Sequence, residues 1–316
     1  MDIVQLKRFL ILAETGHFRR AAARLRISQP ALTHSIKTLE EELGGEIFVR
    51  SSKGVTLSDC GRALVPRARA ILNERERIGT EIRDIALGHT TRLTVGVAPY
   101  FSRRLFPNAV QSLLAEMPQV RLEVIEGHSD ELRAALHEGR IDLAFCVLSP
   151  SIEADDALER QVTCTERYSV VARNKHPLFA RKRIGDRDLA GYPWVVYDLQ
   201  RTPAMYAELF RERGAAAPDC PVATLSLPLM AALVANTDHL ALMPEDFVWP
   251  EIAASRLRRI VGHTLDVVGR GGIIWRRDGL RGEPVKSLAR HIRSVCEQSQ
   301  DKAPRRRGTT AGAMGE

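Results

Sequence analysis

One stretch of the chain carries polar side chains at a spacing suited to binding nucleic acid. Gln29, Thr33 and Lys37 stand at i, i+4 and i+8, with His34 beside them, so a helix would present them on one side. Amide, hydroxyl and ammonium groups on such a face can bond base edges or phosphates in a major groove. A solvated helix surface has a similar composition, so the stripe alone leaves both interpretations open.

The residues around this stripe predict a helix-turn-helix. Residues 18–25 have the helical period, a bend follows at residues 26–28, and a second helix begins after it. Ser28 is a favourable N-cap and Pro30 suits the first turn of a helix. The other side of the second helix carries apolar residues for a core: Leu32, Ile36 and Leu39. With an amphipathic stripe at residues 6–13, three short helices can bury one another in a compact head.

A basic hairpin is expected directly after this head. Residues 47–49 and 55–57 are typical of short strands, and a polar tip connects them. The tip holds Arg50, Ser51, Ser52 and Lys53, followed by Gly54. This is the sequence form of a wing, whose cations would lie along phosphates or in the minor groove.

A long charged helix is expected from about residue 57 to residue 87. Apolar residues recur every seven positions, at Leu57, Leu64, Ile71, Ile78 and Ile85. Such a seam favours pairing with another helix, so the pattern predicts a dimer, with burial inside one chain as the alternative. Pro66 should kink this helix or delay its start.

Beyond Gly88 the pattern alternates between strands and helices. The expected elements are a strand at 92–98, a helix at 104–117, a strand at 120–125, a helix at 129–137 and a buried strand at 142–148. A strand at 168–172 and similar units follow as far as residue 243. This alternation predicts an α/β fold with a largely parallel, doubly wound sheet, whose ligands bind at the carboxyl ends of the strands. Glu138 and Asp142 are interpreted as surface charges, and residues 300–316 as a disordered tail.

Ligand-binding candidates follow the strands of this region. Exposed N–H groups at helix starts can hold the anionic group of a ligand, and a serine precedes two of the helices. The candidates are Tyr100, Phe101, Ser102, His128, Ser129, Cys146, Val147, Tyr197, Thr202 and Pro203. Ser102 and Ser129 could equally be plain helix caps.

Composition excludes several classes of protein. The net charge is +7, and residues 1–72 hold 12 Lys and Arg against 7 Asp and Glu, so most of it lies in the head. Five cysteines without a C-x-x-C pair favour a reducing, cytoplasmic location over a disulfide framework. The longest apolar run, residues 229–235, is far short of a membrane span, and the N-terminus has no signal-peptide pattern.

The sequence contains no catalytic or metal-binding constellation. His128, Ser129 and Asp130 are consecutive and cannot face one another as a triad. The common nucleotide, hydrolase and zinc-protease motifs are absent, and no two histidines stand three or four positions apart. We therefore expect neither an enzyme nor a bound cofactor or metal. A solute-binding protein is a third possibility, which the head and the missing export signal disfavour.

With these elements, the chain resembles the LysR-type transcriptional regulators. The resemblance rests on AAARLRISQPALTHSIKTLEEELGGEIFVR, GVTLSDCGRAL and the heptad helix, and more loosely on RLTVGVAP, LHEGRIDLAF, HPLF and LALMP. It implies a winged helix-turn-helix head, a linker-helix dimer and a periplasmic-binding-protein-like effector domain of two α/β subdomains. Such proteins are usually tetramers, built as dimers of dimers, that respond to a small metabolite.

The resemblance also implies a division of the chain. We expect a DNA-binding domain at 1–58 with its helix-turn-helix at about 18–37, a linker helix at 59–89, an effector domain at 90–299 and the tail at 300–316. Within the effector domain, subdomain I would comprise about 90–163 and 267–299, and subdomain II about 164–266, with the effector between them. The implied partners are double-stranded DNA at an inverted-repeat promoter site, RNA polymerase, the effector and further copies of the chain, without a membrane.

Site residues transfer from the family by position. Gln29, Pro30, Thr33 and Lys37 match its recognition-helix contacts, after the Ser28 cap, and Arg50 and Lys53 its backbone contacts. The chain departs from the family at His34, where arginine is common, and at Arg19 and Arg20, where a small hydroxyl residue is usual. These two arginines could add phosphate affinity, while the shorter His34 alters base preference.

Overall fold

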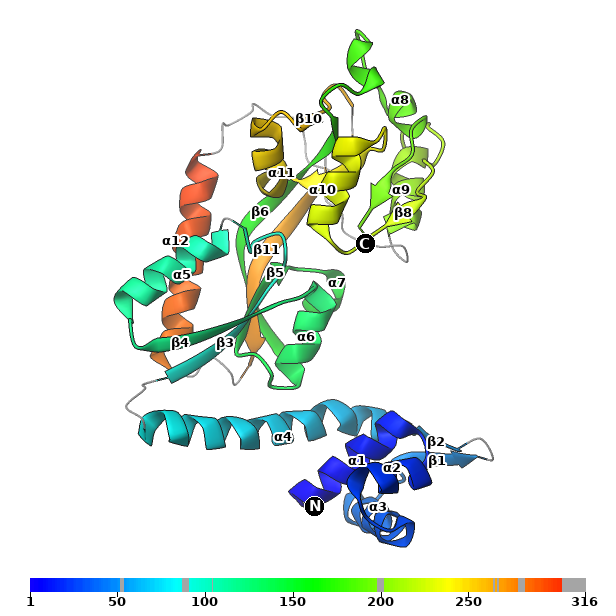
Figure 1. Ribbon diagram of the computed structural model, residues 1–316, viewed down its shortest axis with the longest axis vertical. Coiled ribbons are helices and arrows are strands. Elements are labelled where there is room, and N and C mark those ends of the chain that lie inside the picture. Colours follow the sequence, from blue (N-terminus) through cyan, green and yellow to red (C-terminus); the bar gives the residue numbers. More distant parts are fainter. Residues whose placement is uncertain are drawn as a thin grey trace. The chain divides into compact units, whose positions relative to one another are not determined.

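The computed structural model in Figure 1 describes residues 1–51, 54–86, 91–103, 105–197, 202–263, 265, 267–277 and 282–302. They fall into two units. Unit 1 comprises Met1–Ala98, Leu114–Arg160 and Ile273–Ser287, and unit 2 comprises Pro99–Leu113, Gln161–Gly272 and the chain from Leu288. Within these residues, no helix is both long and apolar enough to span a membrane. The last helix, α12 (Glu283–Lys302), continues past residue 300, and the rest of the expected tail lies outside the described residues.

Three helices and a hairpin form the head of unit 1 (Figure 1). They are α1 (Ile3–Thr15), α2 (Phe18–Leu25), α3 (Gln29–Leu43), β1 (Phe48–Ser51) and β2 (Gly54–Leu57). Asp2 and Gln5 form a capping box at the start of α1, and Gly44 ends α3 in a left-handed conformation. The expected apolar stripes make one core, in which Phe9, Leu32, Ile36 and Leu39 are fully buried. The three-helix head and the hairpin are therefore confirmed.

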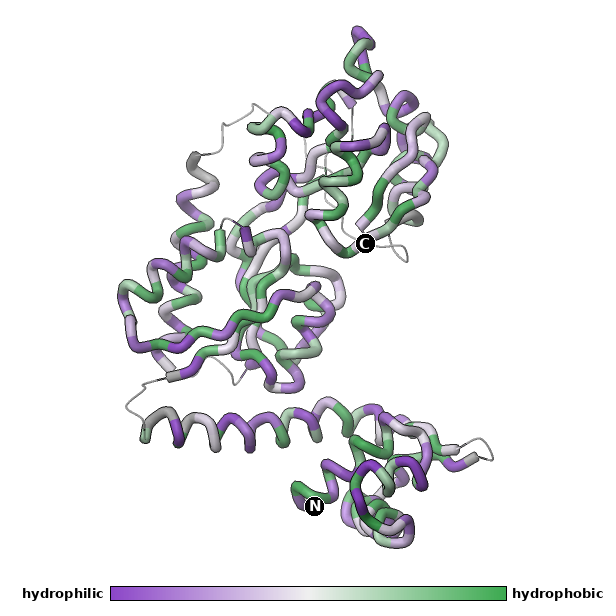
Figure 2. The backbone as a smooth tube through the Cα atoms, in the orientation of Figure 1, coloured by the Kyte–Doolittle hydropathy of each residue, from purple (hydrophilic) through white to green (hydrophobic). Residues whose placement is uncertain are grey.

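The long helix is α4 (Asp59–Ala86), and Pro66 lies inside it, so the proline does not delay its start. The first part of the heptad seam packs on the head, where Leu57 and Leu64 join its core. Further along, Ile71, Ile78 and Ile82 are 38%, 53% and 61% exposed. In Figure 2 the tube of α4 is mostly hydrophilic purple with hydrophobic interruptions. Burial within the chain therefore accounts for only the first half of the seam.

Two carboxylates expected on the surface are in fact held by α4. Asp142 is only 8% exposed, pairs with Arg77 and accepts a hydrogen bond from the Thr94 N–H at 2.9 Å. Glu138 accepts from Arg69 at 2.5 Å. Burial opposes its ionisation, but the hydrogen bonds from Arg140 and Arg69 outweigh that effect and lower the pKa of Glu138. The interpretation as free surface charges was wrong, because the partners are about 65 residues away along the chain.

The α/β part of unit 1 is a parallel sheet with helical connections. Strand β3 (Thr91–Val97) pairs in parallel with β4 (Val120–Glu126) and with β5 (Leu143–Val147), and α6 (Ser129–His137) and α7 (Pro150–Glu153) flank β5 in sequence. Strand β5 is buried at its first four residues, with only Val147 half-buried, and is green in Figure 2. At Gly96 of β3, an added Cβ would lie 2.6 Å from Leu132 of α6, so the helix approaches the strand where there is no side chain.

Unit 2 surrounds a second core. Strand β6 (Leu158–Arg173) pairs antiparallel with β9 (Ala241–Pro244) and β10 (Leu257–Arg259), and β7 (Val195–Val196) pairs in parallel with β8 (Val222–Ala223). Trp194 is fully buried, with its ring 5.1 Å from Tyr206 and 5.7 Å from Phe210. The other elements are α5 (Leu105–Glu116), whose residues 114–116 belong to unit 1, η1 (Pro177–Ala180), α8 (Asp186–Ala190), α9 (Thr202–Arg211), α10 (Leu227–Asn236) and α11 (Glu245–Ala253).

The α/β architecture is confirmed, but the sheet is mixed rather than largely parallel. Its strands follow the order β10–β6–β11–β5–β3–β4, with β9 beside β6, where β11 is Val267–Arg276. Two pairings of β6, with β10 and with β9, are antiparallel, and only residues 168–172 of β6 had been expected as strand. A long strand that pairs with distant segments carries no local signal of its direction.

Candidate nucleic-acid interface and effector residues

The turn between α2 and α3 fixes the direction in which α3 leaves the head. Arg26 ends α2 with φ of 55°, a left-handed conformation that few residues with a Cβ adopt. Ser28 then caps α3, because its Oγ accepts a hydrogen bond from the Ala31 N–H at 3.3 Å. The bend lies where the sequence predicted it, at residues 26–28.

The exposed side of α3 carries an open hollow of about 530 Å³. It is lined by Gln29, Pro30, Thr33, His34 and Lys37, which we call the recognition face. Gln29, Pro30, His34 and Lys37 are exposed and Thr33 is half-buried. Lys37 lies 3.5 Å from Glu41, a solvent-exposed pair that costs little to separate. The structure thus brings together five predicted side chains on one accessible surface.

Two further predicted cations lie at the start of α2. Arg19 and Arg20 are exposed, and neither has a carboxylate within ion-pair distance among the described residues. Arg24, one turn on, is instead paired with Glu14 at 2.9 Å. The positive charge of Arg19 and Arg20 is therefore available to an external anion.

The wing packs on the first turn of the helix-turn-helix. The Arg50 guanidinium lies over the Phe18 ring, 5.1 Å from its centroid, and the Val55 N–H donates to the Gly16 carbonyl at 2.9 Å. Gly54 has φ of 128°, and a Cβ there would meet the Gly16 carbonyl at 2.6 Å. Of the predicted wing residues, Ser52 and Lys53 and the side chain of Ser51 lie outside the described residues.

Three predicted effector residues meet at the end of β5 in unit 1. The Ser129 hydroxyl donates to the Val147 carbonyl at 2.9 Å, so it is engaged with a strand end and is not a helix cap. Cys146 is fully buried, and this burial raises its pKa to about 12, although a hydrogen bond from Ser129 acts in the opposite direction. This thiol is therefore a neutral packing group at physiological pH. The His128 N–H donates to Glu131 at 2.9 Å.

The remaining described candidates lie in unit 2. The Tyr100 ring is 5.5 Å from Tyr197 and 6.1 Å from Tyr168, and we call these three residues the tyrosine cluster. Burial is the main cause that raises the pKa of Tyr100 well above its usual value, and the neighbouring Tyr168 raises it further. Phe101 is fully buried, and the Ser102 hydroxyl donates to the Pro99 carbonyl at 3.2 Å. The side chains of Thr202 and Pro203 lie outside the described residues.

Tyr168 and the carboxylate of Glu166 were missed as candidates. Glu166 is only 4% exposed and contributes to raising the pKa of both Tyr100 and Tyr168. Tyr168 had been placed on a strand, but nothing in the strand pattern connects it with Tyr100, 68 positions earlier. The one available signal was the acidic residue Glu166, two positions before the expected strand at 168–172.

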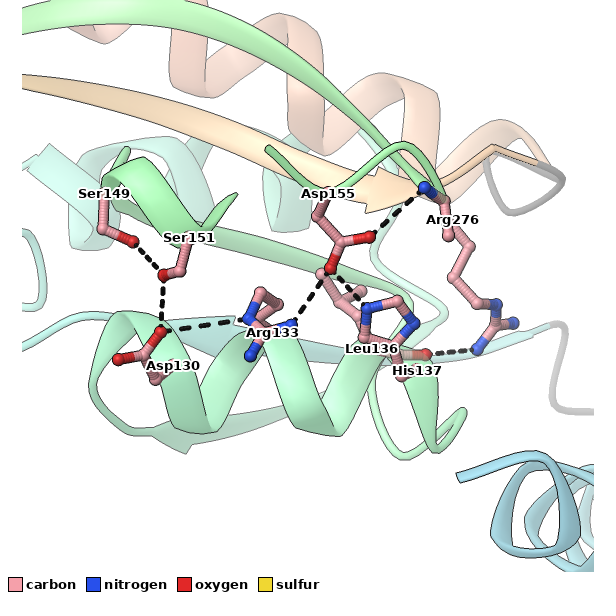
Figure 3. Close-up of polar contacts among 9 residues, drawn as sticks. Asp130, Arg133, Leu136, His137, Ser149, Ser151, Asp155 and Arg276 are labelled. Carbon is pink, nitrogen blue, oxygen red and sulfur yellow. Dashed lines mark hydrogen bonds and ion pairs between the residues drawn. The ribbon is translucent and has the colours of Figure 1, made fainter. Parts of the chain in front are cut away.

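A polar network fastens α6 to the segment after β5 (Figure 3). Asp155 accepts from Arg133 at 3.2 Å and lies 2.6 Å from the His137 ring nitrogen. Ser151 donates to Asp130 at 2.7 Å. Burial opposes the ionisation of Asp155, but the hydrogen bonds from His137 and Arg133 outweigh it and lower its pKa. This network, which the sequence did not indicate, holds the helix that carries Ser129.

The described residues contain no group of three or more His, Cys, Asp or Glu side chains arranged to hold a metal ion. The candidates are instead two groups of polar and aromatic side chains, one in each unit, and an exposed helix face on the head. The chemistry available to them is hydrogen bonding, stacking and charge pairing.

Comparison with known proteins identifies the same two functional regions. Residues 3–62 match the bacterial regulatory helix-turn-helix proteins of the lysR family, and residues 87–297 match the LysR substrate binding domain. The SDS degradation transcriptional activation protein of Pseudomonas sp. (strain ATCC 19151) is 30% identical over 261 residues, which span 81% of this chain and 83% of that protein. A probable nitrogen assimilation transcriptional activator of Synechococcus elongatus is 30% identical over 249 residues, spanning 78% and 79%.

Two solved structures have a similar fold over nearly the whole length of this chain. A full-length OxyR variant from Pseudomonas aeruginosa has a TM-score of 0.60 and 25% identity, covering 94% of this chain and 97% of that one. CbnR, a LysR family transcriptional regulator, has a TM-score of 0.63 at 23% identity, covering 94% and 99%, a likeness of fold. Since both of its domains match, the chain belongs to the LysR family of bacterial transcriptional regulators.

Proposed function

We propose that this protein binds an inverted-repeat promoter site, with α3 in the major groove of each half-site. Gln29 and Thr33 would contact base edges, and Lys37 and His34 would lie beside them. The observation that carries the proposal is the open hollow on α3, lined by five side chains that the sequence had already singled out. An α-helix fits the major groove, and amide and hydroxyl groups there distinguish base pairs.

The phosphate contacts would come from both sides of α3. The charge of the DNA backbone would be neutralised by Arg50 and Lys53 on the wing and by Arg19 and Arg20 on α2. Ser51 and Ser52 on the wing would contact the same phosphates. The exposure of Arg19, Arg20 and Arg50 supports this assignment. Phosphate contacts position a protein without reading sequence, so these residues would set affinity and salt dependence.

Replacing the recognition face tests this assignment. A Gln29→Ala/Thr33→Ala variant should lose preference for the selected site over random duplex, while binding of random duplex changes little. Glu42→Gln, an exposed position further along α3, is the matched control and should leave both affinities unchanged. Equal loss on specific and random DNA would assign the two side chains to phosphate, and no loss would remove α3 from the interface.

We further propose that a small-molecule effector modulates DNA binding through the loops that follow the strands. In unit 1, contacts to the effector would come from Ser129, Val147, Cys146 and His128. In unit 2, they would come from the tyrosine cluster together with Phe101, Ser102, Thr202 and Pro203. The support is that Ser129 and Val147 are hydrogen-bonded to each other and that Tyr100 and Tyr197 are in ring contact. Closure of an effector-bound domain would shift the assembled oligomer between two conformational states and change its affinity for DNA.

A thermal-shift screen of small metabolites tests the effector loops. Compounds that raise the melting temperature of the wild type should do so less in a Ser102→Ala/Ser129→Ala variant. Ser294→Ala, on α12 and outside both groups of candidates, is the control. An equal shift in the wild type and the double variant would remove these loops from the effector site.

The remaining parts of the proposal concern assembly and setting. We propose that the protein is cytoplasmic, has no catalytic activity, forms a dimer through α4 and a tetramer as a dimer of dimers, and acts on RNA polymerase at the promoter. The support is its family membership and the exposed isoleucines of α4.

A further inference from the structure

A second pocket lies in unit 2, away from every residue assigned above. It measures about 490 Å³ and opens where the segment after η1 meets β10. Its lining includes Phe179, Arg181, Lys182, Arg183, Arg258 and Arg259, which we call the basic pocket. This volume is within the range of small-molecule sites, about 300–1,000 Å³.

Only part of the positive charge of this pocket is neutralised within the protein. Arg181 is paired with Asp188, and Arg259 lies 3.1 Å from Glu245. Among the residues that the structure describes, Lys182, Arg183 and Arg258 have no carboxylate within 4.0 Å. Three cations around one hollow repel one another, so the pocket favours a ligand with more than one negative charge.

One of these cations is held in place by stacking. The Arg258 guanidinium lies over the Phe179 ring, 4.2 Å from its centroid, and the uncharged ring does not neutralise it. The backbone of Arg258 is fixed as well, since it pairs with Ala172 in the β10–β6 ladder. A guanidinium restrained in this way loses little freedom when it binds an anion.

The lining of the pocket also includes apolar side chains and a glycine. Val261 is 57% exposed, and Ile184 is half-buried. Gly262 has φ of 97°, and a Cβ there would come within 3.3 Å of the Ile184 carbonyl, so a glycine lets the two segments approach. The pocket therefore offers an apolar surface beside its cations.

We propose that the basic pocket binds a phosphorylated organic anion, a small molecule that carries phosphate groups and an apolar or aromatic part. Phosphate matches the planar donor fork of arginine, and two or more phosphate charges would balance Lys182, Arg183 and Arg258. Phe179, Ile184 and Val261 would contact the organic part. This site is separate from the proposed effector loops and does not depend on them.

Calorimetric titration of the full-length protein with pyrophosphate and with adenosine 5′-triphosphate tests the proposal, with adenosine as the uncharged reference. Both anions should bind the wild type, the nucleotide more tightly, and adenosine should not. An Arg183→Gln/Arg258→Gln variant should lose at least ten-fold in affinity for both. The control Arg187→Gln/Arg211→Gln removes the same charge from exposed positions outside the pocket and should bind within two-fold of the wild type.

Several results would overturn the proposal. They are the failure of both anions to bind the wild type, and equal weakening in the pocket and control variants, which would indicate diffuse charge alone. Loss of random-duplex binding in the pocket variant without loss of pyrophosphate binding would assign the surface to nucleic acid instead. If the double variant lost its native circular dichroism, Lys182→Gln, at an exposed position, carries the same test with a smaller expected loss of about three-fold.

Discussion

The Arg50 guanidinium of β1 lies 5.1 Å from the centroid of the Phe18 ring, the first residue of α2. This contact joins the wing to the helix-turn-helix, so the cation on the wing has a defined position relative to Arg19 and Arg20. The ring restrains the guanidinium without neutralising it. The charge of Arg50 therefore remains available to a phosphate.

Replacing Arg50 by glutamine should weaken binding to all duplexes alike. The slope of log affinity against log salt should fall in magnitude by about 1, as expected for one lost phosphate contact. Fluorescence anisotropy at several salt concentrations measures this slope. Phe18→Leu keeps the charge and should keep the slope, and a selective loss on one sequence would instead give Arg50 a base-reading role.

Gln29→Ala alone should relax specificity at a single base pair of each half-site. The expected cost is about 1–3 kcal/mol at that base pair, because a bidentate amide contact is lost there and elsewhere the interface is unchanged. Competition between duplexes that differ at one position measures it. A uniform loss at every position would contradict the assignment.

The exposed seam of α4 should hold the dimer together. Ile78→Lys places a charge among Ile71, Ile78 and Ile82 and should dissociate the dimer at micromolar concentrations, because an unpaired charge would be buried at the interface. Sedimentation equilibrium measures the mass. Glu76→Lys, at an exposed position between two seam residues, is the control and should leave the assembly intact. A dimer that survives Ile78→Lys would move the interface off α4.

The Asp155 network should make unit 1 sensitive to acid. The native pKa of Asp155 lies below its ordinary value of 3.8, so the ionised carboxylate stabilises the fold above that pH. This contribution is lost as pH falls through the lowered native pKa. Asp155→Asn should cost about 1.5–3 kcal/mol at pH 7, and the difference from the wild type should shrink below pH 3.8. Urea unfolding followed by circular dichroism measures both, and a difference independent of pH would contradict the role of the charge.

Two glycines make a matched pair for packing. Gly96→Ala would bring a methyl group to 2.6 Å from Leu132 and 2.7 Å from Ile141, and should cost about 1–3 kcal/mol. Gly79 lies inside α4 with nothing within 4 Å of its added Cβ, so Gly79→Ala should stabilise by about 0.5–1 kcal/mol. Thermal melting of the two variants should therefore shift in opposite directions. A shift of both in the same direction would contradict this account of the β3–α6 contact.

The features that were predictable from the sequence are those with a local period. The head follows from stripes such as Leu32, Ile36 and Leu39, and the turn at residues 26–28 follows from a cap and a proline. The recognition face was predictable for the same reason, since the core side of a helix determines which side is exposed. Both depend on residues within one or two turns of each other.

The features that were missed depend on residues far apart in the chain. Three of these features join segments about 70 or more residues apart: the antiparallel pairing of β6, the contact of Tyr100 with Tyr168 and the stacking of Phe179 with Arg258. Asp142 is buried for the same reason, because its partners Arg77 and Thr94 come from other elements. No local period encodes such a pairing, and it is determined only when the sheet and helices pack.

The proposed function requires this protein to read DNA sequence with α3 as a dimer. We would test it by selecting bound duplexes from a random pool with the purified full-length protein, at two salt concentrations. We expect an inverted repeat whose half-sites are in phase on one face of the duplex, with affinity that falls as salt rises. Absence of enrichment, with no salt-sensitive binding, would contradict the claim and leave the head as a surface for binding another protein.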